Sequence, residues 1–317
     1  MPRISIIIPV LGDPTLLDDT LVSVLENRPA NCEILVFHNR PYHDPYELAG
    51  EVRFFEVDSR TTLADCLNLA LRASRSPVVH VVTCGVEVFP GWADAAMRHF
   101  RDPEVAAVAA VVVDRDDCRK VVSAGLGYRA EGEARRLGQG GAVDEVEPDQ
   151  DGLCGPDLLA AFYCKSTLQE VGGFSRFASD TLTGIDAWLA VRRAGFRCVL
   201  EPGCRAKVDA ASIKEQPRFR LGHDSERLFW RWASTHGWAR SLLGHAALTA
   251  GECVLGLWRV QMAVHLAGRA WGVGRWMLGP VLSQDKRHRE PATLLIGSRQ
   301  HASDEESEPC RDSARAA

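Results

Sequence analysis

The sequence predicts an α/β protein with a mostly parallel sheet flanked by helices and a helical extension at its C-terminal end. Continuous apolar runs, such as residues 4–10 and 77–84, are typical of strands buried on both faces. Segments with helical spacing alternate with these runs, which favours a parallel sheet covered by helices on both sides. Beyond residue 217 the strand signals end and only helical segments follow.

The first half of the chain supplies its elements in regular order. Because ligands bind beyond the carboxyl ends of parallel strands, His38, Asp58 and residues 83–87 are expected around one crevice. The elements predicted in this half are strands at 4–10, 32–38, 51–58, 77–84 and 105–114 and helices at 15–27, 61–74 and 90–102.

The second half is less regular. Residues 125–155 are rich in Gly and charged side chains, which predicts a long loop. A helix is predicted at 186–196, followed by a short strand that ends at Pro202. The predicted division of the chain is a domain at 1–216, a helical region at 217–282 and a disordered tail at 283–317.

Composition narrows the class of protein. The 317 residues carry a net charge of −5, so no overall basic field favours a nucleic-acid partner. The ten cysteines have irregular spacings without a Cys-x-x-Cys pair, which predicts reduced thiols and a cytoplasmic protein. The opening residues lack a signal-peptide pattern, and no run reaches the roughly 18 uncharged apolar residues that a membrane-spanning helix needs.

Several segments carry a resemblance to a known family. Taken in order, they resemble glycosyltransferases of family 2, which have the GT-A fold, and the resemblance covers residues 3–235. It implies a nucleotide-sugar donor and a glycan or lipid-linked acceptor. The segments are ISIIIPV, EILVFHNRP, LADCLNLALRASRSPVVHVVTCGVEVFPGW, LQEVGGFSRF and TGIDAWLAVRRAGFRCVLEPGC.

The resemblance implies a divalent cation, Mn²⁺ or Mg²⁺, held by an Asp-x-Asp-like motif at the end of the fourth strand. In this chain the motif positions read Thr83, Cys84 and Gly85, so its carboxylates are missing and the cation is in question. Glu87 is the nearest acid and is a predicted metal ligand, with a solvated loop residue as the alternative. Asp209 lies nearest to the place of a late family His and is the second predicted ligand.

The donor side also departs from the family. The second strand ends in His38 where the family has an Asp; a His can bond a base edge, and Arg40 can face a phosphate. Both residues equally suit an ordinary surface loop. Asp65 is predicted to help in the nucleotide pocket, with a helix-surface charge as the alternative. Asn68 matches the family's Asn, and the resemblance implies that it too helps to bind the donor.

Catalysis by inversion needs a general base that takes the proton of the attacking hydroxyl group. The family's Glu-Asp-x-Asp motif reads here from Thr183 to Asp186, which leaves Gly184 at the base position. Asp186 and the nearby Asp180 are therefore the predicted catalytic carboxylates. Asp186 equally fits the N-cap of a helix that begins there.

The C-terminal helices contain an unusual mixture of residues. Trp and Arg side chains are interspersed among Leu, Val and Ala in residues 239–282, as in helices that lie at a membrane interface. The pattern predicts peripheral contact with the inner face of a membrane, or a homodimer, or a helical pair packed on the core. The residues concerned are Trp258, Trp271, Trp276, Arg259, Arg269 and Arg275.

Two functions remain open from the sequence. One is transfer of a sugar from a nucleotide-sugar donor to a glycan or lipid-linked acceptor, with His38, Arg40, Asp65, Glu87 and Asp186 in place of the usual acids. The other is a catalytically inactive GT-A protein that binds a glycan or pairs with an active transferase, which the missing acids favour. A dehydrogenase is disfavoured because no Gly-x-Gly-x-x-Gly follows the first strand.

Overall fold

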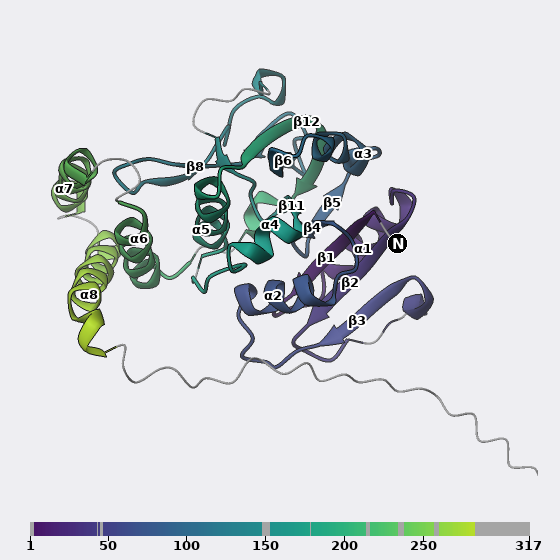
Figure 1. Cartoon of the computed structure of the whole chain (residues 1–317), viewed down its shortest axis with the longest axis horizontal. Coiled ribbons are helices and arrows are strands. Elements are labelled where there is room, and N and C mark those ends of the chain that lie inside the picture. The colour runs from purple at the N-terminus through teal and green to yellow at the C-terminus, as the bar shows by residue number, and fades with distance from the viewer. Residues whose placement is uncertain are drawn as a thin grey trace, which may run out of the picture.

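The computed structural model describes residues 3–42, 44, 47–147, 153–177, 179–213, 216–233, 238–256 and 260–282. The tail predicted at 283–317 lies outside these residues. A central sheet occupies the middle of the molecule, with helices on both of its faces and a group of helices at one side (Figure 1). The chain is therefore an α/β protein with a C-terminal helical region, as predicted.

Nine strands of the described chain form the main sheet, in the order β3-β2-β1-β4-β11-β6-β12-β5, with β7 paired to β6. The strands are β1 (Ile4–Val10), β2 (Cys32–His38), β3 (Val52–Glu56), β4 (Val78–Val82), β5 (Val86–Val88), β6 (Val105–Asp114), β7 (Val121–Ser123), β11 (Ala160–Cys164) and β12 (Arg197–Val208). The helices are α1 (Leu17–Glu26), α2 (Leu63–Ala73), α3 (Trp92–Met97), α4 (Lys165–Glu170), α5 (Asp180–Arg193), α6 (Arg218–Trp232), α7 (Trp238–Gly256) and α8 (Val260–Leu282).

The direction of the strands places the site. β1 runs parallel to β2 and β4, and β2 runs parallel to β3, so the carboxyl ends of these four strands meet at one edge. β11 is antiparallel to both β4 and β6, which makes the centre of the sheet mixed. The loop that precedes β11 therefore comes back to the edge where β4 ends.

Successive residues of β1 explain why its sequence is apolar throughout. Ile7 packs into the core on the side of α2 and α5, whereas Ile6 and Ile8 pack on the side of α1 and α3. Alternate side chains of a strand point to opposite faces, and here both faces are covered. The two hydrophobic cores hold the sheet between two layers of helices.

The C-terminal helices are attached through α6. Leu228 and Trp232 of α6 are buried in the same core as Ile185 and Trp188 of α5. In Figure 1, α7 and α8 lie at the outer side of the molecule, with α6 between them and α5. Within the described residues, no helix is both long and apolar enough to cross a membrane. The domain boundary at 216 stays a prediction.

Three local predictions were wrong. Residues 125–155 are not one loop: β8 (Leu126–Tyr128) pairs with β9 (Ala134–Arg136) and β10 (Leu153–Gly155) in a small antiparallel sheet. Strands of three residues are too short to show a periodicity. Helix α5 begins at Asp180, six residues before the predicted start, and β12 continues through Pro202 to Val208 across an irregularity in its pairing with β6.

Candidate functional site at the carboxyl ends of the strands

Asn39 joins the ends of three parallel strands. Its Oδ1 accepts a hydrogen bond from the backbone N–H of Gly12 at 2.9 Å, and its Nδ2 donates to the carbonyl of Ser59 at 3.5 Å. His38 beside it is buried, with Nδ1 at 2.8 Å from the carbonyl oxygen of Arg40. Only a protonated Nδ1 satisfies that carbonyl, so Nε2 of a neutral ring is left as a hydrogen-bond acceptor.

Two cations follow neighbouring strands at this edge. Arg40 comes after β2 and Arg60 comes after β3, and both side chains are exposed. Within the part of the chain that the structure describes, neither guanidinium group has an ion-pair partner. Arg60 was not singled out from the sequence, because one arginine in a polar loop carries no signal of its own.

Asp65 lies at the start of α2, and both of its carboxylate oxygens are engaged. Thr62 caps the helix and donates its hydroxyl hydrogen to Oδ2 of Asp65 at 2.6 Å. Nε of Arg176 donates to Oδ1 at 2.7 Å. Asp65 therefore ties α2 to the loop that leads into α5.

Asn68, one turn further along α2, is engaged in the same way. Its Oδ1 accepts from the N–H of Phe174 at 2.9 Å, and its Nδ2 donates to the carbonyl of Phe174 at 2.8 Å. The structure therefore places the side chains of Asp65 and Asn68 in contact with one loop, residues 173–177.

The backbone of the loop after β4 disfavours the acid that the resemblance implies. Gly85 has a φ of +93°, a backbone conformation that side-chain-bearing residues rarely adopt. A Cβ atom built there would lie 3.1 Å from Cδ1 of Leu16. The N–H of Gly85 donates to Oγ1 of Thr20 at 2.8 Å, which holds the loop against α1. The loop backbone thus suits glycine.

Glu87, a predicted metal ligand, is held by two cations. Oε1 lies 2.9 Å from Nε of Arg115, and Oε2 lies 2.9 Å from Nζ of Lys207. Arg115 also contacts Asp19, at 3.6 Å, and the carbonyl oxygen of Gly85, at 3.3 Å. Both carboxylate oxygens of Glu87 are therefore in ion pairs on the side of the loop that faces α1.

Asp209, the second predicted ligand, directly follows β12. The pairing of Val208 with Val86 brings Asp209 beside Gly85. Its Oδ1, however, accepts from the N–H of Ala211 at 2.8 Å. Nowhere in the described chain do three or more His, Cys, Asp or Glu side chains form a group suited to a metal ion. The residues at this position do not fit a divalent cation.

A second cluster of charges lies where the loop before β11 returns to the end of β4. Oγ1 of Thr83 donates to the carbonyl of Leu158 at 2.9 Å, which joins the two segments. The preceding Asp157 is buried, and its Oδ2 accepts from Nε of Arg136 at 2.7 Å. Neither Asp157 nor Arg136 was predicted; the only sequence signal was an acid directly before an apolar strand.

Asp180 stands beside this pair as the first residue of α5, behind the N-cap Ser179. Asp180 as a residue is exposed to solvent. Desolvation of its carboxyl group and the nearby Asp157 carboxylate nevertheless raise the pKa of Asp180 to about 6, against the opposing charge of Arg136. A carboxyl group with a pKa near neutrality is suited to exchange protons with a ligand.

Asp186 has a different environment. Its side chain is 1% exposed, Oδ1 accepts from Nε1 of Trp232 at 2.8 Å, and Oδ2 lies 3.1 Å from a guanidinium nitrogen of Arg231. The alternative that Asp186 caps the helix is wrong, since it lies in the second turn of α5. A Cβ atom on Gly184 would lie 3.1 Å from Leu126 and 3.4 Å from Leu158, so the family's base position faces the core.

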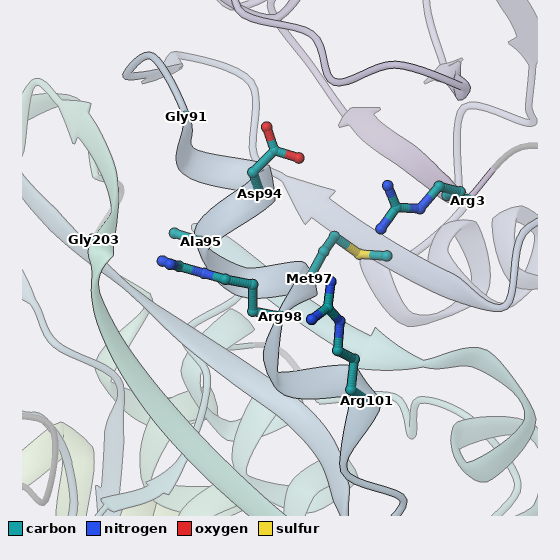
Figure 2. Close-up of a pocket in the computed structure, with 8 residues that line it drawn as sticks. All are labelled: Arg3, Gly91, Asp94, Ala95, Met97, Arg98, Arg101 and Gly203. Carbon is teal, nitrogen blue, oxygen red and sulfur yellow. The ribbon is translucent and has the colours of Figure 1, made fainter.

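A cavity of about 530 Å³ lies at the opposite edge of the sheet, beside Arg3 at the start of β1. In Figure 2 the guanidinium groups of Arg3 and Arg101 point toward Met97, while Arg98 extends toward Gly203. None of the predicted site residues lines this cavity. Of the predicted residues, His38 and Arg40 lie at the carboxyl end of β2, whereas Asp186 contacts α6.

Comparison with known proteins bears on the fold. No protein-family model matches the sequence, and no curated protein matches it. Among solved structures, a mannosyltransferase, PcManGT from Pyrobaculum calidifontis in complex with GDP-Man and Mn2+, is 17% identical with a TM-score of 0.50, over 86% of this chain and 87% of that chain. GalNAc-T7 with UDP, GalNAc and Mn2+ is 12% identical with a TM-score of 0.49, over 71% of this chain and 48% of that chain. The chain therefore has a GT-A-like glycosyltransferase fold.

Proposed function

We propose that this chain is a glycosyltransferase that moves a sugar from a nucleotide-sugar donor to a hydroxyl group of a glycan or lipid-linked acceptor. The GT-A-like fold and the polar residues at the carboxyl ends of β1, β2 and β4 support this proposal. The observation that carries it is the place of Asp180, an exposed carboxyl group at the start of α5 beside the Arg136–Asp157 pair; its raised pKa suits a group that takes the proton of an acceptor hydroxyl.

The donor is proposed to bind without a metal ion. The structure of PcManGT holds Mn2+, but here Gly85 offers no side chain and Glu87 is bound by Arg115 and Lys207. A diphosphate still needs compensating positive charge, and an exposed guanidinium can supply it in a fixed planar geometry. Arg40 and Arg60 are the cations proposed for this role, and Nε2 of His38 is proposed to accept a hydrogen bond from the base.

The acceptor is proposed to lie over the start of α5. The carboxylate of Asp180 takes the hydroxyl proton while the hydroxyl oxygen attacks the anomeric carbon and the nucleoside diphosphate leaves with the bonding pair. This displacement inverts the configuration at the anomeric carbon, and it needs a single general base such as Asp180. The charges of Asp157 and Arg136 act on Asp180 in opposite directions, and Asp186 joins α5 to α6.

The second function, a catalytically inactive binding or scaffold protein, is favoured by one observation. Two of the family's acid positions are occupied by glycines, and both sites disfavour a carboxylate: Gly85 has a positive φ that side-chain-bearing residues rarely adopt, and Gly184 faces the core. A protein of this kind would retain a ligand crevice without turning over a donor.

Calorimetric titration of UDP-, GDP- and dTDP-sugars, with and without Mn²⁺, separates these functions. We expect micromolar binding that does not depend on the metal and that weakens at least about tenfold in Arg40→Ala, because a charged hydrogen bond to phosphate is lost. Arg98→Ala, at the distant cavity, is the matched control. Binding that requires Mn²⁺ would contradict the metal-free donor site.

Turnover is then measured as release of the nucleotide from the donor that binds. Asp180→Asn is expected to abolish the release at unchanged donor affinity. Binding with no turnover by the wild-type chain would favour the scaffold function. Failure of every nucleotide to bind would reject the transferase.

A further inference from the structure

The helices α7 and α8 turn apolar side chains outward. Leu243 of α7 is 74% exposed, and on α8 Val260 is 82% and Trp271 is 59% exposed. Helices on the surface of a globular protein normally direct apolar residues to the core and polar residues to water. The exposed apolar residues of these two helices, here called the outer face, are Leu242, Leu243, Val254, Val260, Val264, Trp271 and Met277.

The same two helices turn their ionic side chains inward. Arg269 of α8 is 5% exposed and contacts Glu226 of α6, which is 1% exposed, at 2.5 Å. Nε2 of His245 on α7 lies 3.0 Å from the same carboxylate, and Glu252 pairs with Arg269 at 2.8 Å. Charges inside and apolar groups outside are the reverse of a water-facing arrangement, so the outer face is built for a different environment.

Among the described residues of α7 and α8, the exposed ionic side chains are positive: Arg240 lies on α7 and Arg275 on α8. The only acidic residue between 238 and 282 is Glu252, which is held by Arg269. The two helices therefore combine exposed apolar side chains and tryptophan with cations and with no available carboxylate.

We propose that the outer face of α7 and α8 docks in the interfacial layer of a membrane that contains anionic lipids. Helices of this kind lie in the plane of the membrane, with apolar side chains among the upper acyl chains and arginines at the headgroups. No helix of the described chain is long and apolar enough to cross the bilayer, which fits a contact in the plane.

A second copy of the chain fits the outer face less well. In a symmetric dimer the same patch lies on both sides of the interface. Arg240 and Arg275 would then meet cations and no acid of the opposite face, which is unfavourable. Anionic headgroups neutralise the same arginines. Membrane docking goes beyond the proposed function and holds whether or not the chain transfers sugar.

Sedimentation of the full chain with vesicles tests the proposal. The vesicles contain phosphatidylcholine alone or with about 30% phosphatidylglycerol, at low salt and at about 0.5 M NaCl, where exposed charges are screened. We expect binding to the anionic vesicles, weaker binding to the neutral ones, and a loss of this difference at high salt. Wild-type protein that stays in solution with anionic vesicles would overturn the proposal.

Surface variants locate the contact. Leu243→Ser with Trp271→Ser should lower the partition coefficient at least about tenfold, because exposed apolar area that enters the membrane is lost. Val22→Ser, an exposed apolar residue of α1, is the matched control and should bind like wild type. Arg240→Glu with Arg275→Glu should remove the preference for anionic vesicles. The substituted residues of α7 and α8 are all exposed, so circular dichroism should show an intact fold.

Gel filtration with light scattering covers the other occupant. A wild-type dimer that Leu243→Ser with Trp271→Ser converts to a monomer, together with no vesicle binding, would assign the outer face to a second copy and overturn the proposal. A monomeric wild-type protein that binds vesicles supports the proposal, provided that Leu243→Ser with Trp271→Ser reduces the binding and Val22→Ser does not.

Discussion

The side-chain amide of Asn68 is hydrogen-bonded to both the N–H and the carbonyl of Phe174, which lies 106 residues away in the chain. The contact closes the loop before α5 onto α2. The contact is close enough to require glycine at position 173, since a Cβ atom on Gly173 would lie 2.3 Å from Oδ1 of Asn68. A residue predicted to bind cofactor thus has a structural role in holding α2 and the acceptor-side loop together.

Asn68→Ala is expected to lower the free energy of unfolding by about 2–3 kcal/mol, because it leaves the N–H and the carbonyl of Phe174 without partners. Asn68→Asp keeps the acceptor and loses the donor, so its effect should be smaller. Denaturant unfolding measures both. Unchanged stability with lost nucleotide binding would instead favour the predicted role of Asn68 in the donor site.

Gly85→Asp, which restores the family acid, is expected to destabilise the protein without creating a metal site. A side chain at a φ of +93° costs about 1–2 kcal/mol, and the added Cβ also crowds Leu16. Gly91→Ala is the control, because Gly91 also has a positive φ but has open space around it. Thermal unfolding and Mn²⁺ titration provide the readouts; Mn²⁺ binding by Gly85→Asp would contradict the expectation.

Asp180 should make stability depend on pH in a defined direction. Its pKa is raised from 3.8 to about 6 in the folded chain, so between these values the folded state holds a proton that the unfolded state releases. Stability therefore falls as the pH rises through this window. Asp180→Asn removes the penalty, so its Tm should exceed that of wild type above pH 6 and match it near pH 3, below both pKa values.

The same carboxyl group should shape the activity profile. The base form of Asp180 is lost on acidification, so kcat/KM of the proposed transfer should decline as the pH falls below about 6. Arg136→Lys changes the cation beside Asp180. It should shift the pH at which kcat/KM declines, while the decline itself remains. A profile that is flat across this range would rule out Asp180 as the base.

Arg269→Met should be strongly destabilising, by about 3–5 kcal/mol, because the buried Glu226 loses the guanidinium group that contacts it. Arg275→Met, at an exposed arginine of the same helix, is the control and should change stability by less than about 0.5 kcal/mol. The double variant Arg269→Met with Glu226→Gln should recover part of the loss. An equal loss in the double variant would contradict the role of the buried charge.

Burial raises the pKa of Glu226, but hydrogen bonds and charges from His245 and Arg269 outweigh it and hold that pKa below its ordinary value. Because this pKa is lower in the folded than in the unfolded chain, ionised Glu226 stabilises the folded state at pH values above its ordinary pKa. This stabilisation is lost as the pH falls through the pKa of the folded state. The C-terminal helices should therefore loosen in acid before the sheet does, which hydrogen exchange at acidic pH can follow.

The strands at the centre of the sheet were predictable, and the small sheet of β8, β9 and β10 was not. The runs of β1, β2 and β4 are predominantly apolar because both faces of these strands are covered, so the apolar run itself identifies them. The three-residue strands β8, β9 and β10 are held by pairing with one another, and their sequence carries no repeat.

The sequence by itself determined the α/β class, the order of the main elements and which polar residues follow the strand ends, because periodicity and chain order are local properties. Tertiary structure decided which of those residues are available. The sequence predicts site roles for both Glu87 and Asp186. In the structure, Glu87 is bound by Arg115 and Lys207. Asp186 is bound by Trp232 and Arg231. The raised pKa of Asp180 likewise depends on Asp157. Ion pairs and pKa values arise from groups brought together by packing across long stretches of chain, and no local pattern encodes them.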